Sequence, residues 1–148
     1  MKSPEILDEG FKKSDLPEIN KIKTEIKELE NKDWYGIIMI CIVAALIFLY
    51  TIVHISQFGL NIPTLALNGI FLILNIIALF LSREDKMIAY IIGLIAWLLF
   101  VFFNILLNNS TFLGGILWNL VIIGSYAIFI YEAAKIKVLK SRLKKLQS

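Results

Sequence analysis

The most regular polar pattern in the chain is a series of asparagines within otherwise apolar sequence. Asn61, Asn68 and Asn75 recur every seven residues, which is nearly two helical turns, so they share one face of a helix. In a membrane, amide side chains are expected to face other helices rather than acyl chains. The spacing therefore predicts a polar face inside a helical bundle, with Asn104 and Asn119 as candidate neighbours on two other helices.

This asparagine face supports two interpretations. One is a polar path for a small solute or ion. The other is a set of amide hydrogen bonds that hold helices together, each worth about 0.6 kcal/mol on average. No ionisable residue accompanies the amides, and proton-coupled transport usually requires one inside the membrane. The structural interpretation is therefore favoured, and a passive pore is the alternative.

Motifs for catalysis and metal binding are missing from the sequence. It has no glycine-rich phosphate loop, no HExxH, no GxSxG and no paired carboxylates within the apolar stretches. His54 is the only histidine, and no acid accompanies it in the surrounding apolar sequence, so we predict no metal site. Cys41 is the only cysteine, so no intrachain disulfide can form. We expect no catalytic residue and no cofactor.

Two long uncharged blocks must position these side chains. Residues 34–82 and 87–131 contain no Asp, Glu, Lys or Arg, and the hydrophobic fraction of 58% exceeds the roughly 45–50% of ordinary soluble chains. One helical crossing needs about 20 residues, so each block is long enough for two. The runs do not alternate as barrel strands do. We predict an all-α, four-span transmembrane bundle with spans at about 34–55, 61–81, 86–107 and 112–131.

Local signals mark the ends of these spans. Gly59 and Pro63 predict a turn before the second span. Ser82, followed three residues later by Asp85, predicts a cap for the third. An interfacial aromatic belt is predicted at the charged ends of the spans, formed by Trp34, Tyr35, Tyr90 and Tyr131. Small residues that would let helices approach closely are Cys41, Ala45, Gly114, Gly115 and Gly124.

The positive charges predict the orientation. Seven Lys precede the first span, Arg83 and Lys86 lie between the second and third, and six Lys or Arg follow the fourth, whereas the two opposite loops have none. The positive-inside bias therefore places both termini in the cytoplasm, in a multi-pass protein that we assign to the cell membrane. Nucleic-acid binding is not expected, because the basic tail is short and lies next to a membrane that competes for it.

Charged segments with apolar seams flank the membrane domain of residues 34–132. The N-terminal segment, residues 1–33, contains an amphipathic helix at about 16–31, and residues 133–148 continue the fourth span as a basic helix. Within each helix, apolar residues repeat with spacings of three, four and three, as in a heptad seam. These seam residues are Ile19, Ile22, Ile26 and Leu29 in the first helix and Ile136, Leu139, Leu143 and Leu146 in the second.

The two seams suggest partners. They can pair within one chain or between chains, in a homo-oligomer or a larger membrane complex. The basic helix can contact either anionic lipid or an acidic neighbour. Its candidate headgroup contacts are Lys135, Lys137, Lys140, Arg142, Lys144 and Lys145.

Three functions follow from the sequence as hypotheses. The leading one is a non-enzymatic membrane protein that acts in assembly, or as an accessory subunit, through its cytoplasmic helices. The first alternative is a small oligomeric channel or transporter with an asparagine-lined path. The second is a pore-forming lysis or toxin protein.

Overall fold

The computed structural model describes residues 16–32, 34–108 and 115–147, which form five α-helices and, within these ranges, no strand. The all-α fold class is thereby confirmed for the described residues. Four of the helices, α2 to α5, are long and apolar enough to cross a membrane. In chain order the helices are α1 (Leu16–Lys32), α2 (Trp34–Phe58), α3 (Ile62–Leu81), α4 (Lys86–Asn108) and α5 (Ile116–Leu146).

The α2–α3 connection follows the predicted turn chemistry. Gly59 has a φ of 77°, in the left-handed region that glycine adopts without a steric penalty. Asn61 then occupies the N-cap position of α3, and Pro63 lies in the first helical turn, where a missing N–H group costs no hydrogen bond. α2 continues to Phe58 rather than ending near residue 55.

The prediction that Ser82 caps the third span is wrong. Ser82 ends α3 instead, and its hydroxyl donates to the carbonyl oxygen of Leu79 at 2.7 Å. Asp85 directly precedes α4, and the backbone N–H of Ile88 donates to Asp85 Oδ1 at 3.3 Å. The short side chain of an aspartate next to the helix start can accept hydrogen bonds from the unpaired N–H groups, and its negative charge interacts favourably with the positive end of the helix dipole.

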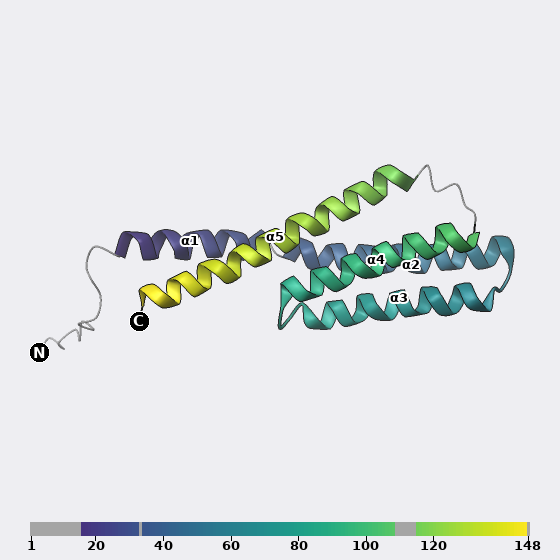
Figure 1. The fold of residues 1–148 in the computed structure, drawn as a ribbon, viewed down its shortest axis with the longest axis horizontal. Helices are drawn as coiled ribbons and strands as arrows, with labels where there is room; N and C mark the ends of the chain where they lie inside the picture. Colours follow the sequence, from purple (N-terminus) through teal and green to yellow (C-terminus); the bar gives the residue numbers. More distant parts are fainter. Residues whose placement is uncertain (1–15, 33, 109–114, 148) are drawn as a thin grey trace, which may run out of the picture.

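The helices form an elongated molecule with two parts. α2, α3 and α4 lie side by side, with α3 in contact with both α2 and α4 (Figure 1). α5 packs on α4, but its first half diverges from the other helices, and its second half runs beside α1 at the far end of the molecule (Figure 1). We call α1 together with residues 132–146 of α5 the helix pair.

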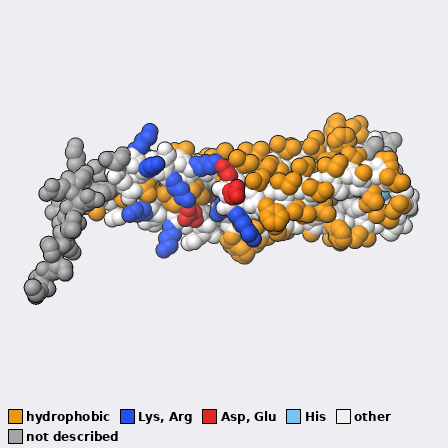
Figure 2. All heavy atoms as spheres, turned by 90° about the horizontal axis from the view of Figure 1, so that it is seen from below, with side chains coloured by type: hydrophobic (Ala, Val, Ile, Leu, Met, Phe, Trp, Pro, Cys, Tyr) orange, Lys and Arg blue, Asp and Glu red, His pale blue; other side chains and the backbone are white. Residues whose placement is uncertain are grey.

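Surface chemistry follows this division. In Figure 2, hydrophobic side chains cover the part built from α2, α3 and α4, whereas the visible Lys, Arg, Asp and Glu side chains gather at the end that holds the helix pair. Large apolar side chains such as Phe48, Leu49, Ile73 and Phe80 are exposed. An apolar surface of this extent is typical of a protein that contacts lipid.

Two glycine–tyrosine contacts fix how closely the helices approach. A Cβ atom added to Gly36 of α2 would collide with the ring of Tyr90 of α4, and one added to Gly93 of α4 would lie 2.7 Å from Tyr126 Oη of α5. Both tyrosines are fully buried. Tyr90 therefore belongs to the core, and its predicted place in the aromatic belt is wrong because its face of α4 points into the bundle.

Two of the predicted close-approach residues, Ala45 and Gly124, do not lie where helices meet. Cys41 and Ala45 are exposed on α2, and a Cβ atom at Gly124 would meet nothing within 4 Å. The predicted role is wrong for Ala45 and Gly124, because Ala45 is exposed and Gly124 faces open space. Cys41, although exposed, interacts electrostatically with Tyr126 of α5. Gly114 lies outside the residues that the structure describes.

Candidate functional site

The seam residues of the helix pair lie between α1 and α5. Ile19, Ile22 and Ile26 of α1 are only 4%, 5% and 8% exposed, and Ile136 of α5 is 7% exposed. α1 and α5 are in direct contact. The remaining seam residues are half-buried: Leu29, Leu139, Leu143 and Leu146. Of the two predicted pairings, the structure thus contains the one within a single chain.

Three ion pairs connect the two helices of the pair. Arg142 Nη2 lies 2.5 Å from Glu18 Oε1, Lys135 Nζ lies 2.7 Å from Glu25 Oε1, and Lys140 Nζ lies 2.8 Å from Glu30 Oε1. The helices run in opposite directions, so Arg142, near the end of α5, meets Glu18, near the start of α1 (Figure 1). Charge complementarity and the apolar seam therefore favour the same antiparallel arrangement.

A fourth ion pair ties α5 to the loop between α3 and α4. Lys137 Nζ lies 2.5 Å from Asp85 Oδ2, while the other carboxylate oxygen of Asp85 accepts the N–H of Ile88. The hydrogen bond from Lys137 holds the pKa of Asp85 below its ordinary value, and backbone N–H groups at the start of α4 add to this effect. One carboxylate thus both caps α4 and anchors α5.

Ion pairing also shifts the titration of the α1–α5 contact. The hydrogen bond from Lys135 lowers the pKa of Glu25, and the same hydrogen bond raises the pKa of Lys135. Both charged forms are therefore favoured near neutral pH. The groups are exposed, so solvent and salt weaken the effect.

These ion pairs change the interpretation of the basic residues. Among the six candidate headgroup contacts, Lys135, Lys137, Lys140 and Arg142 bind carboxylates of the same chain. Lys144 is exposed and lies twelve residues beyond Glu132, a helical distance of about 18 Å. In the predicted topology Glu132 ends the membrane domain, so Lys144 would lie more than twice the Debye length, about 8 Å at physiological salt, from the membrane surface. The structure pairs most of this helix with an acidic neighbour, one of the two predicted alternatives.

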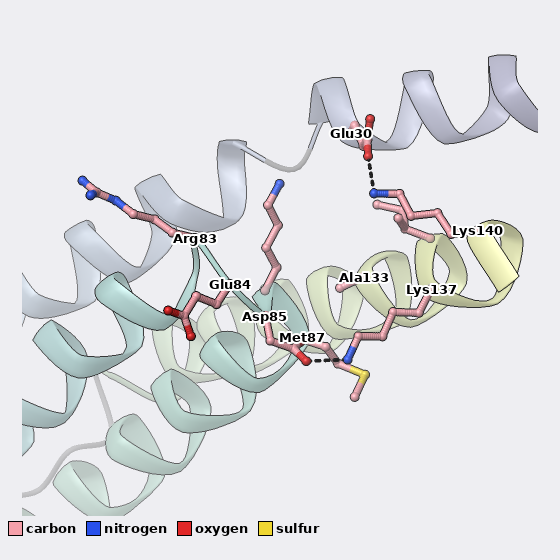
Figure 3. Close-up of a pocket in the computed structure, with 10 residues that line it drawn as sticks. Glu30, Arg83, Glu84, Asp85, Met87, Ala133, Lys137 and Lys140 are labelled. Carbon is pink, nitrogen blue, oxygen red and sulfur yellow. Dashed lines mark hydrogen bonds and ion pairs between the residues drawn. The ribbon is translucent and has the colours of Figure 1, made fainter. Parts of the chain in front are cut away.

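A recess of about 340 Å³ lies where the helix pair meets the α3–α4 loop. In Figure 3 the Glu30–Lys140 pair and the Asp85–Lys137 pair lie on two sides of it, whereas the side chains of Arg83 and Glu84 extend from the loop away from both pairs. Its lining is rich in both signs of charge and has an apolar part. The lining residues are Glu30, Arg83, Glu84, Asp85, Lys86, Met87, Ala133, Ile136, Lys137 and Lys140.

The structure brings together only some of the predicted asparagines. Asn68, Asn75 and Asn104 are buried, and Asn104 Nδ2 lies 3.5 Å from Asn68 Oδ1, a long hydrogen bond between α3 and α4. Asn61 is exposed in the α2–α3 connection and does not join them, because it precedes the first turn of α3. Asn119 is half-buried on α5.

The buried amides bond mainly to their own helices. Asn75 Nδ2 donates to the carbonyl oxygen of Phe71 at 2.9 Å, and Asn104 Nδ2 donates to that of Phe100 at 2.8 Å. Asn68 Nδ2, Asn75 Oδ1 and Asn119 Oδ1 are buried without a hydrogen-bond partner among the described residues. No continuous polar path follows from these contacts.

His54 and Thr64 are buried polar residues that sequence reasoning did not place in the core. His54 is 7% exposed, and its ring centroid lies 6.0 Å from that of Tyr50 and 5.0 Å from that of Phe58. The regular spacing of Tyr50, His54 and Phe58 along one helix face was the available signal. No group of three or more His, Cys, Asp or Glu side chains suited to a metal occurs among the residues that the structure describes.

Comparison of the chain with protein-family models, with curated proteins and with solved structures gave no match in any of the three.

Proposed function

We propose that this protein is a non-enzymatic, four-span integral membrane protein that acts in assembly, or as an accessory subunit, through its cytoplasmic helix pair. In this proposal α2 to α5 cross the cell membrane and both termini are cytoplasmic. The partner, a second copy or another membrane protein, contacts the outer surface of the folded pair.

The observation that carries the proposal is the continuity of α5. It is one helix from Ile116 to Leu146, so it leads without a break from the apolar part of the molecule into the helix pair. The Asp85–Lys137 ion pair ties it to the α3–α4 loop, and three further ion pairs tie it to α1. A surface held this firmly relative to the membrane is suited to positioning a partner, because little conformational entropy is lost on binding.

Within-chain pairing changes how assembly would occur. The apolar seam is already buried, so a partner would meet the polar outer face, which carries Lys23, Thr24, Lys27 and Glu28. Charged surfaces of mixed sign favour specific and salt-sensitive contacts. We therefore expect association that weakens with ionic strength.

Site-specific photocross-linking in native membranes tests the proposal. A photoreactive residue at Lys27, on the outer face, should give a discrete protein adduct, whereas one at Leu120, an exposed apolar position on α5, should not. The Lys27 adduct should disappear in Ile22→Asp, which disrupts the seam, and persist in Gln57→Asp, an exposed position on α2 that is not part of the outer face. Lipid adducts alone from Lys27, or an adduct indifferent to Ile22→Asp, would reject assembly through the pair.

The proposed topology has its own test. Cysteines introduced singly at Thr24 and Asn61, in a Cys41→Ser background, should react differently with a membrane-impermeant thiol reagent applied to intact cells. Asn61→Cys should be labelled and Thr24→Cys protected. Labelling of both or the reverse pattern would contradict cytoplasmic termini.

A further inference from the structure

We propose that the recess between the helix pair and the α3–α4 loop binds the zwitterionic headgroup of a phospholipid that carries a primary ammonium, such as phosphatidylethanolamine. The inference rests on the membrane insertion proposed above. It concerns a ligand site and is independent of the partner that the outer face would contact.

The place of the recess in the fold matches the headgroup level of a bilayer. Its loop residues follow directly after α3, whose apolar sequence ends at Leu81, and its α5 residues begin one position beyond Glu132. Figure 2 shows acidic and basic side chains meeting the apolar surface at one border. A lipid whose acyl chains lie against the apolar helices would therefore have its headgroup beside this recess.

The charges of the recess favour a zwitterion over a simple anion. Four Lys or Arg side chains and three carboxylates line it, so an anionic headgroup would also face acidic groups. Two of the carboxylates, Glu30 and Asp85, are neutralised by Lys140 and Lys137. Arg83 and Glu84 are exposed and form no ion pair with the described part of the chain. Lys86 also has an interaction partner, so Arg83 and Glu84, adjacent in the loop sequence, supply one further cation and one further anion.

The chemistry of ethanolamine fits this pair. An arginine guanidinium can donate two parallel hydrogen bonds to a phosphate, so Arg83 is suited to the phosphodiester. Glu84 can accept a charge-assisted hydrogen bond from a primary ammonium, whereas the trimethylammonium of choline has no N–H group to donate. Ala133 and Ile136 are buried and, with Met87, provide the apolar part of the recess. Its volume lies at the lower end of the range for small-ligand sites.

Lipid binding to the purified full chain, measured by native mass spectrometry, tests the inference. Three phospholipids with identical acyl chains and ethanolamine, choline or glycerol headgroups would be compared. We expect the ethanolamine lipid to bind about tenfold more tightly than the choline lipid, the ratio that one charge-assisted hydrogen bond provides. Tighter binding of the anionic glycerol lipid, or equal binding of all three, would overturn the proposal.

Variants identify the site. Glu84→Gln should abolish the preference for ethanolamine over choline, and Arg83→Gln should weaken the binding of both lipids; both positions are exposed, so folding should be preserved. Glu28→Gln and Lys144→Gln, exposed and outside the recess, serve as matched controls and should change nothing. Lipid selectivity unaltered in both recess variants would place the lipid elsewhere and reject the site.

A soluble headgroup distinguishes a lipid from a free phosphate ester. Phosphoethanolamine in solution should compete only at concentrations far above that of the lipid, because it lacks the acyl chains that contact the apolar helices. If it binds as tightly as the lipid, the lipid assignment is wrong. The Lys27 cross-linking experiment does not depend on this result, so failure of the lipid site and failure of the assembly proposal can be told apart.

Discussion

The helix pair and the three-helix part formed by α2, α3 and α4 satisfy their polar side chains in different ways. In the pair, Glu18, Glu25 and Glu30 each meet a cation of the other helix. In the three-helix part, Asn75 and Asn104 bond to carbonyl oxygens of their own helices, and the interhelical Asn104–Asn68 contact is long.

The contrast indicates what holds each part together. Charges and an apolar seam specify the arrangement of the pair, as expected for helices in water. Close packing contributes in the apolar part, where Tyr90 lies against Gly36 and Tyr126 against Gly93. This agrees with the proposed membrane insertion, because lipid provides no hydrophobic driving force between helices. Substitutions of the seam, the glycines and the asparagines should therefore have unequal effects.

Opening the helix pair should have the largest effect. Ile22→Asp places a carboxylate at a position that is buried in the apolar seam, and a buried charge without a partner costs about 3–5 kcal/mol. We expect α1 to detach from α5 while α2, α3 and α4 stay folded. Hydrogen exchange of the α1 amides would report this loss. Thr24→Asp, at an exposed position, should leave exchange unchanged, and protection of α1 in Ile22→Asp would show that the seam does not hold it.

Crowding of a glycine–tyrosine contact should come next. Gly93→Ala introduces a methyl group 2.7 Å from Tyr126 Oη, and overpacking of this kind costs about 1–3 kcal/mol. Gly69→Ala is the matched control, because its methyl group would meet nothing within 4 Å and alanine favours the helix by up to about 1 kcal/mol. Denaturation in mixed micelles measures the free energy of unfolding of both variants. Equal stability of the two variants would mean that the close approach of α4 and α5 is not needed.

Removal of an amide from the apolar part should have a smaller effect. Asn104→Leu removes the contact with Asn68 and the hydrogen bond to the Phe100 carbonyl oxygen. We expect the free energy of unfolding to change by about 0.6 kcal/mol or less. The same micelle denaturation applies. A loss of several kcal/mol would show that the amides, rather than packing, organise this part of the molecule.

Acid should loosen the helix pair and its tie to the loop by the smallest amount. Hydrogen bonds from lysines lower the pKa of Asp85 and of Glu25, so these contacts stabilise the fold above the unfolded values of about 4 and are lost as the pH falls through the lowered folded values. The raised pKa of Lys135 sets the alkaline limit: the Lys135–Glu25 contact is lost only as the pH rises beyond about 10.4, where Lys135 deprotonates. Fluorescence transfer between α1 and α5 should be constant from about pH 5 to 10; a transition near pH 6–8 would contradict these assignments.

Periodic features were predictable because they are local. Two uncharged blocks indicated the long apolar helices, and spacings of three and four indicated the seams that include Ile22 and Ile136. The rotation of each helix about its axis was not predictable, since four apolar helices have no strongly polar face to turn outward. For this reason Tyr90 was assigned to the aromatic belt and His54 was not placed in the core, although both are buried.

Contacts between distant positions were equally beyond single-sequence reasoning. The seven-residue spacing correctly placed Asn68 and Asn75 on one buried face, but nothing in the spacing distinguished Asn61, which precedes the helix. Likewise, the charges of α5 were visible, whereas the choice of Glu25 for Lys135 and of Asp85 for Lys137 depends on how three segments pack.

In the structure, α1 and the end of α5 pair within one chain. Spin labels at Lys23 and Ser141, both exposed, in a Cys41→Ser background reconstituted in bilayers, allow their separation to be measured by pulsed electron paramagnetic resonance. We predict a single narrow short distance that is unchanged when labelled chains are diluted with unlabelled ones. A short distance that vanishes on dilution, or a broad distribution at every dilution, would contradict pairing within the chain.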